Sequence, residues 1–219
     1  LRFAGFAGAV VALAAALMLG GCSEGGEPEA ESSLGTGEPP HVVIVLVDAL
    51  RADRLGVNGY PLPTTPNLDA LAAEGINFSA FFSHSTWTKP SIATLFTALY
   101  PSQHGVGTVA QEGQGGLVTD RLGEGLVTLA ERFQAAGYAT MGVVNQVHLN
   151  PGFGFAQGFE FYRPRRGTSA LQINTVVDRW LGREDRGDRP VFAYIHYLDA
   201  HWPYNRKLPR HRGVFGDGA

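Results

Sequence analysis

Short apolar runs alternate along the chain with longer segments in which apolar residues recur at every third or fourth position. The run from Val42 to Val47 is unbroken and rich in β-branched residues, which is typical of a strand buried on both faces of a parallel sheet. We predict further strands over residues 76–82, 138–144 and 191–197. Strands that alternate with helices indicate an α/β fold with a mostly parallel central sheet and helices on both of its faces.

Amphipathic segments between these runs predict helices over residues 64–74, 90–99, 126–136 and 170–181. Pro66 near the start of the first helix and Gly75 after its end are typical helix boundaries. Gly137 ends the third helix in the same way. No internal repeat is present in the sequence, so we expect one domain rather than an array.

The first 21 residues have a different pattern, in which the basic Arg2 precedes an apolar stretch rich in alanine, leucine and valine. This is the pattern of a secretory signal peptide, and it ends in Leu19-Gly20-Gly21-Cys22, which resembles the lipobox of bacterial lipoproteins. The resemblance implies a lipid on Cys22 and a place in the bacterial cell envelope. Ser23 after the cysteine favours the outer membrane. A plain transmembrane anchor is the alternative, since about 20 apolar residues span a bilayer.

Residues 22–40 combine the cysteine with glycine, serine and proline, and all of their charges are glutamates. Such a segment buries too little apolar surface to offset the entropy of ordering it, so we expect a flexible acidic linker. The sequence becomes strongly apolar after His41, and we expect residues 41–219 to form the folded domain.

Composition and charge narrow the function classes. The chain is 44% apolar and 17% charged, which is the balance of a globular protein rather than a disordered one. Its formal net charge of -3 gives no electrostatic reason to expect nucleic acid as a partner. Its single cysteine excludes an internal disulfide and a cysteine-based zinc site.

Polar residues follow the predicted strands, and ligands of open parallel sheets bind beyond the carboxyl ends of the strands. The residues concerned are Asp48, Asn145, His148, Asp199 and His201. Asp48 directly follows a buried strand, so the sheet fixes its backbone while its carboxylate reaches the crevice, which suits a hard divalent cation. From its position alone, Asp48 as a cap of the next turn is an open alternative.

The sequence around Asp48 extends this pattern. Residues 47–56 read VDALRADRLG, and residues 64–75 read TTPNLDALAAEG. Together they closely resemble the N-terminal block of the sulfatase family, a branch of the alkaline-phosphatase superfamily. The resemblance implies an alkaline-phosphatase-like fold and makes Asp48 a metal ligand. Many relatives carry a second aspartate after the first, and Ala49 stands in its place, so one carboxylate is missing.

Residues 85–105 read STWTKPSIATLFTALYPSQHG, which resembles the sulfatase signature and places Thr88 at the nucleophile position. A hydroxyl at a helix N-terminus faces unpaired N–H groups, which suits a tetrahedral anion. An ordinary N-cap is the alternative role for Thr88. Sulfatases make formylglycine from cysteine or serine, and threonine cannot yield that aldehyde. Ile92 also replaces the arginine that supports the modified residue.

Threonine is the nucleophile of phosphotransfer members of the superfamily, in which a bound cation activates the hydroxyl. The resemblance therefore implies a divalent metal cofactor, with Ca²⁺ first and Zn²⁺ or Mn²⁺ if the reaction is phosphotransfer, and no formylglycine. The chemistry of Thr88 favours a phosphate or phosphonate ester, whereas the family favours a sulfate ester. The expected partner is a small-molecule, glycan or lipid ester.

The resemblance extends to two further segments. His148 matches a sulfatase histidine that contacts the ester, and Gln146 stands where sulfatases have a lysine. His201 matches a histidine that donates to an ester oxygen, whereas we expect His196 to be packed within its strand. We predict Thr88, His148 and His201 as catalytic residues. Asn145, Gln146 and His201 are the predicted substrate-binding residues.

The later metal-binding segments of the family have no match after Tyr204, so we expect residues 41–219 to be the N-terminal part of a sulfatase-like catalytic domain, incomplete at its C-terminus. We predict a lipid-anchored, metal-dependent ester hydrolase or transferase. The rival interpretation is a catalytically inactive lipoprotein that binds an anion or a glycan. Ala49, Ile92 and Gln146 all favour that rival.

Overall fold

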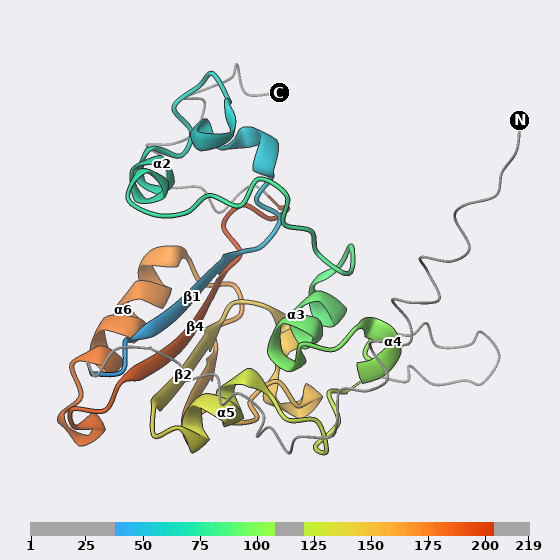
Figure 1. Ribbon diagram of the computed structural model, residues 1–219, viewed down its shortest axis with the longest axis vertical. Coiled ribbons are helices and arrows are strands. Elements are labelled where there is room, and N and C mark those ends of the chain that lie inside the picture. The colour runs from blue at the N-terminus through green and yellow to red at the C-terminus, as the bar shows by residue number, and fades with distance from the viewer. Residues whose placement is uncertain (1–37, 108–120, 204–219) are drawn as a thin grey trace, which may run out of the picture. The chain divides into compact units, whose positions relative to one another are not determined.

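The computed structural model describes residues 38–107 and 121–203 (Figure 1). The chain divides into a unit at residues 1–38 and a unit from Pro39 onward, and only the second is described below. The predicted signal peptide at 1–21, the lipidation site Cys22 and nearly all of the linker at 22–40 lie outside the described residues. No helix within residues 38–107 and 121–203 combines the length and apolar character needed to cross a bilayer.

The core of the fold is a four-stranded sheet in the order β1-β4-β2-β3, in which all neighbouring strands are parallel. Its strands are β1 (Val42–Val47), β2 (Ala139–Val144), β3 (Phe161–Pro164) and β4 (Val191–Tyr197). The predicted parallel α/β sheet is therefore confirmed. β1 lies at one edge, next to β4, with Leu46 opposite His196 in the register. The prediction that β1 is buried on both faces is wrong, because Val43 and Val45 are 54% and 55% exposed.

The α-helices are α2 (Pro66–Ala73), α3 (Thr88–Thr97), α4 (Pro101–His104), α5 (Leu129–Ala135) and α6 (Ala170–Leu181). Short 3-10 turns are η1 (Ala52–Arg54), η2 (Gly56–Asn58), η3 (Val147–Leu149), η4 (Pro151–Phe153) and η5 (Glu184–Arg186). α5 begins three residues later than predicted, because Thr128 and Glu131 form a capping box at its start: each side chain accepts a hydrogen bond from the backbone N–H of the other residue.

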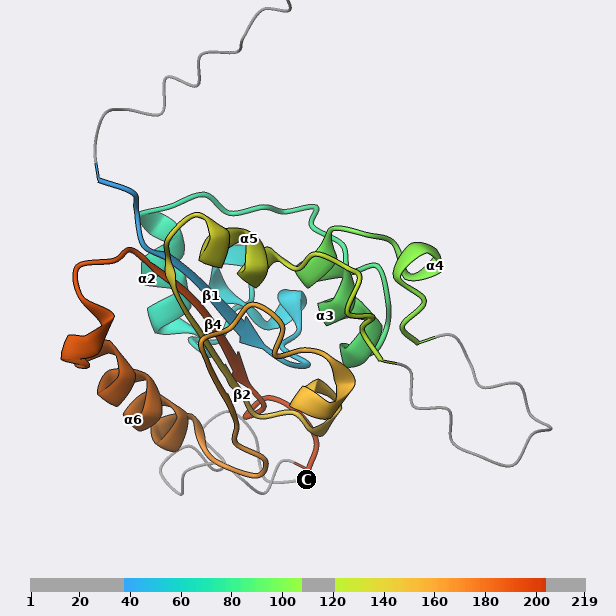
Figure 2. The ribbon, with the colours of Figure 1, turned by 90° about the horizontal axis from the view of Figure 1, so that it is seen from below.

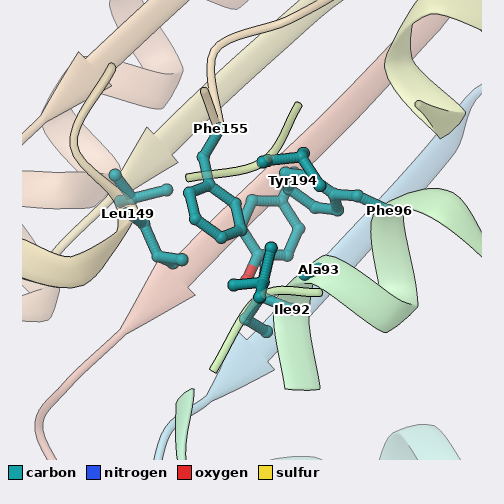
Figure 3. Close-up of a cluster of buried hydrophobic side chains, with 9 residues drawn as sticks. Ile92, Ala93, Phe96, Leu149, Phe155 and Tyr194 are labelled. Atoms are coloured by element: carbon teal, nitrogen blue, oxygen red, sulfur yellow. The ribbon is translucent and has the colours of Figure 1, made fainter. Parts of the chain in front are cut away.

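Helices cover both faces of the sheet, as the alternation in β4 shows. Ala193 and Ile195 pack with residues of α6, including Ile173 and Trp180. Tyr194 faces the other way and packs against α3 (Figure 3). Figure 2 shows α6 on one side of the strands and α3 and α5 on the opposite side. The predicted two-faced helical cover is thus confirmed.

The predicted strand at residues 76–82 is wrong. These residues form no strand in the structure, and Ile76, Phe78, Phe81 and Phe82 are 72–83% exposed. An apolar run becomes a strand only when another strand pairs with it and a core covers its side chains, and neither is found for this run among the described residues. β3 was not predicted, since its four residues carry only two apolar aromatic side chains before Arg163 and Pro164.

Candidate active site

Asp48 lies at the carboxyl end of β1, where its backbone N–H donates to the Tyr197 carbonyl at 2.9 Å and continues the β1–β4 ladder. The chain then turns sharply, because Ala49 has a φ of 59° in the left-handed region. The sheet therefore holds the Asp48 backbone while its side chain, 15% exposed, reaches beyond the strand. This is the placement that the sequence predicted for a ligand-binding carboxylate.

Thr88 is the first residue of α3, and Trp87 is the N-cap. The alternative that Thr88 is an ordinary N-cap is thus wrong. Its hydroxyl instead donates to Oδ2 of Asp48, with 3.0 Å between the two oxygens. The predicted proximity of strand tip and helix start is confirmed.

Two more side chains approach the same carboxylate oxygen. Gln146, which is 9% exposed, donates from Nε2 to Asp48 Oδ2 at 3.4 Å. The Nε2 atom of His196 lies 3.5 Å from that oxygen, and the two atoms are not hydrogen-bonded. His196 is fully buried, so the prediction that it packs within its strand is confirmed. Because side chains in a strand alternate between its two faces, the sequence could have shown that the His196 ring lies on the same face as Tyr194.

The contacts around Asp48 stabilise its ionised form. Burial acts to raise the pKa of its carboxyl group, but the contacts with His196, Thr88 and Gln146 outweigh burial and hold the pKa below 3.8. Asp48 is therefore an anion at neutral pH, which is the form that binds a cation.

An open cavity of about 450 Å³ lies at this end of the sheet. It is lined by the end of β1, the start of α3, the segment before α3, and His201. The cavity brings together Asp48, Thr88 and His201, three of the residues predicted for the site.

The remaining predicted residues do not line this cavity. His148 is exposed, and its ring contacts Trp87 edge-on with 6.3 Å between the centroids. Asn145 is buried and clamps a loop: its amide donates to the Thr168 carbonyl at 2.6 Å and accepts from the Gly167 N–H at 2.9 Å. Oδ1 of Asp199 accepts from Ala170 N at the start of α6, at 3.2 Å.

The residues present suit a hard divalent cation in kind but not in number. Asp48 and Thr88 supply oxygen atoms, and no hydrogen bond from a described residue reaches Oδ1 of Asp48. Ca²⁺ takes six to eight oxygen ligands. Among the described residues, no group of three or more histidine, cysteine, aspartate or glutamate side chains is placed to hold a metal ion. The described residues therefore do not form a complete set of cation ligands.

The fold is that of the alkaline-phosphatase-like α/β proteins. The chain belongs to the sulfatase family, whose family model matches residues 40–218. It is 37% identical over 123 residues to arylsulfatase A of Bos taurus, covering 55% of this chain and 23% of the relative. It is 35% identical over 119 residues to N-acetylgalactosamine-6-sulfatase of Mus musculus, covering 52% and 23%. The chain thus spans about a quarter of the length of these curated relatives.

Solved structures share the fold. The C-terminal periplasmic domain of EcEptC from Escherichia coli, in complex with Zn, matches with a TM-score of 0.59 and 18% identity over 84% of this chain and 50% of that one. The phosphonate monoester hydrolase of Agrobacterium radiobacter matches with a TM-score of 0.57 and 21% identity, over 78% and 43%. At these identities the likeness concerns the fold.

Proposed function

We propose that the full-length protein is a metal-dependent ester hydrolase or transferase of the sulfatase family in which Thr88 is the nucleophile. The observation that carries the proposal is the 3.0 Å hydrogen bond from the Thr88 hydroxyl to Asp48 at the mouth of an open cavity. This bond directs the hydroxyl proton toward the carboxylate, so the oxygen lone pairs are free to face a substrate.

In this proposal Oγ1 of Thr88 forms a bond to the phosphorus or sulfur atom of the ester, and the bond from that atom to the alcohol oxygen breaks. The Thr88 hydroxyl gives up its proton as this bond forms, and the departing alcohol takes up one proton, so the first half of the reaction balances. Water or a second alcohol then attacks the same phosphorus or sulfur atom, the bond from that atom to Oγ1 breaks, and Thr88 regains a proton from the attacking molecule. A divalent cation held by Asp48 would lower the pKa of the hydroxyl and offset the developing negative charge. The start of α3 provides backbone N–H groups for the anionic oxygens.

The favoured substrate is a phosphate or phosphonate ester, with a sulfate ester second. Threonine cannot become formylglycine, and Ile92, at the position of the supporting arginine, is 3% exposed within the core cluster of α3. A phosphonate monoester hydrolase shares the fold, which is compatible with this chemistry. The names of the curated relatives support sulfate esters, including those of amino sugars.

His201 is assigned to the ester oxygens because it lines the cavity with Thr88. Gln146 is assigned to the orientation of Asp48 and to neutral contacts with the substrate. His148 is exposed beside Trp87, where it would reach a bound substrate from the rim. Asn145 supports the site by holding the loop at Gly167, and its predicted contact with substrate stays a prediction.

We place this enzyme in the bacterial cell envelope, anchored by a lipid on Cys22, with the outer membrane favoured. The sequence of residues 19–23 supports this placement, and a periplasmic domain is among the proteins that share the fold. The rival function is an inactive protein that binds an anion or a glycan in the same cavity. Ala49 and Gln146 favour the rival, because each removes a charge that catalysis in the family uses.

The deciding experiment measures turnover of an aryl phosphate, a phosphonate monoester and an aryl sulfate by the full-length protein with added Ca²⁺, Mn²⁺ or Zn²⁺. We expect Thr88→Ala to lower turnover by about three orders of magnitude or more, and Thr88→Ser to retain much of it. Turnover that survives Thr88→Ala would exclude the proposed nucleophile. Binding of phosphate or a sulfated sugar without turnover of any ester would favour the inactive rival.

A further inference from the structure

The buried imidazole of His196 lies beneath the Asp48 carboxylate. Its strand β4 is the neighbour of β1, and His196 stands opposite Leu46, two residues before Asp48. The side chain is 0% exposed, and neither ring nitrogen has a hydrogen-bond partner among the described residues.

A buried polar ring in this position is unfavourable unless it interacts with another polar or charged group. A buried imidazole without hydrogen bonds is less stable than an apolar side chain of similar size in the same place. The carboxylate of Asp48 is within reach, with 3.5 Å from Nε2 to Oδ2. The ring of Tyr194 lies on the same face, with 6.2 Å between the centroids, and its hydroxyl also has no partner among the residues described.

The approach of His196 completes an asymmetric environment for Asp48. Oδ2 faces the Thr88 hydroxyl, the Gln146 amide and the His196 ring, whereas no described residue donates a hydrogen bond to Oδ1. Three groups on one oxygen resist rotation of the carboxylate about its χ2 bond. Oδ1 is then the oxygen left for a cation.

We propose that His196 is a positioning residue for the Asp48 centre: it carries its proton on Nε2, donates that proton to Oδ2, and so orients the carboxylate toward Thr88 and a cation. The inference rests on the proposed function, and it adds a residue that the predicted site did not include. Residues that hydrogen-bond to a metal ligand without touching the metal raise metal affinity, because they fix the orientation of that ligand. A shift of a few tenths of an ångström would bring Nε2 within ordinary hydrogen-bond distance.

The test compares His196→Leu, His196→Gln and His196→Asn in the full-length protein. Leucine fills the space without a donor, the amide nitrogen of glutamine lies near the position of Nε2, and that of asparagine lies near Nδ1. Titration calorimetry with Ca²⁺ and with Mn²⁺ measures cation affinity, and thermal unfolding measures stability. We expect the leucine and asparagine variants to bind the cations about 10- to 100-fold more weakly, with glutamine restoring most of the affinity.

A purely packing role predicts the reverse pattern, in which leucine preserves both stability and cation affinity while glutamine preserves neither. Cation affinity within twofold of the parent protein in a folded His196→Leu variant would overturn the proposal. If leucine prevents folding, the comparison of glutamine with asparagine decides in the same way.

A second measurement needs no cation. Nitrogen-15 spectra of histidine-labelled protein report which ring nitrogen carries the proton, and we expect Nε2–H for His196, with its resonance moving on Asp48→Asn. A proton on Nδ1, or no response to Asp48→Asn, would also overturn the proposal. Failure of the proposed function looks different: Thr88→Ala would then leave turnover intact, or the protein would bind no cation, while the His196 spectrum still responded to Asp48→Asn.

Discussion

The hydroxyl oxygen of Thr88 lies 3.0 Å from Oδ2 of Asp48, although 40 positions separate these residues in the sequence. One side chain comes from the end of an edge strand and the other from the first turn of a helix packed on the sheet. The backbone of each is fixed by its own element, so neither must be ordered when a ligand arrives. Preorganisation of this kind is what a nucleophilic site requires.

Asp48→Asn is expected to remove most of the cation affinity. The substitution keeps the shape and the acceptor for Thr88 but deletes the negative charge. We expect the affinity for Ca²⁺ and Mn²⁺ to fall by more than about 100-fold. This loss is larger than the loss caused by removing a residue that only hydrogen-bonds to a metal ligand. The matched control is Asp53→Asn, because Asp53 is exposed and paired with Arg51 away from the cavity. Equal losses in the two variants would contradict the assignment.

Gln146→Lys is expected to strengthen the binding of anions. Gln146 is neutral and directed at the site, and a lysine there restores the charge that sulfatases carry. A charge-assisted hydrogen bond exceeds a neutral one by about 1 kcal/mol, so inhibition by inorganic phosphate should tighten about fivefold. Gln146→Met, which has similar length and no charge, is the control. Phosphate inhibition that stays the same in the lysine variant would show that position 146 does not face the anion.

His104 is expected to make the protein less stable in mild acid. Its burial lowers the pKa of the imidazole below 6.5 and outweighs the backbone of Pro90, which acts in the opposite direction. Nδ1 accepts from the Val106 N–H at 3.0 Å, which requires the unprotonated nitrogen. As the pH falls below about 6.5, the unfolded chain binds a proton that the folded one does not, so the free energy of unfolding decreases.

Urea unfolding at a series of pH values between 5 and 8 measures this effect. We expect a shallower pH dependence in His104→Asn, since an asparagine oxygen can replace the Nδ1 acceptor without titrating. His84→Asn is the control because His84 is exposed. An unchanged slope in His104→Asn would show that other groups set the acid sensitivity.

Asn145→Ala is expected to destabilise the fold by about 2–3 kcal/mol, because it leaves the Gly167 N–H and the Thr168 carbonyl without their buried partner. Asn150→Ala is the comparison: Asn150 is exposed and makes one local bond, to Gly152 N at 3.0 Å, worth about 0.5–1 kcal/mol. Chemical denaturation of both variants gives the difference. If Asn145→Ala lowers the free energy of unfolding by no more than Asn150→Ala does, the two hydrogen bonds of Asn145 contribute little to stability.

Gly158→Ala is expected to be much more harmful than Gly167→Ala. Both glycines have left-handed backbones, with φ of 79° and 77°, so alanine meets similar strain of about 1–2 kcal/mol at each. At Gly158 a Cβ would also lie 2.1 Å from the backbone nitrogen of Glu131, whereas at Gly167 it would meet nothing within 4 Å. The clash adds about 1–3 kcal/mol. Thermal midpoints of the two variants measure the difference, and equal midpoints would refute the close approach.

The sequence supported the prediction of three strands and the helices between them because their apolar periods are long and clear. The prediction failed where the formation of a strand depends on pairing with a neighbouring strand. The run at 76–82 has the composition of a strand but lacks a pairing partner in the described structure, and β3 pairs with β2 despite a weak pattern of its own.

The candidate site, too, could be predicted from the sequence only in part. A strand tip and a signature motif were enough to bring Asp48 and Thr88 together. His196 was recognised only as a buried strand residue, since its approach to Asp48 depends on the register of β1 against β4. Asn145 and Asp199 follow strands as predicted, but their hydrogen bonds to the loop at Gly167 and to the start of α6 cannot be derived from spacing, and a role in the site stays a prediction for both.

The edge position of β1 has a practical consequence. Val43 and Val45 are 54% and 55% exposed, and within the described residues no strand pairs with the outer side of β1. An open, β-branched edge is a template for pairing with another chain. Preparations limited to these residues should therefore self-associate as concentration rises, and a lysine at position 43 or 45 would be the simplest way to keep them monomeric.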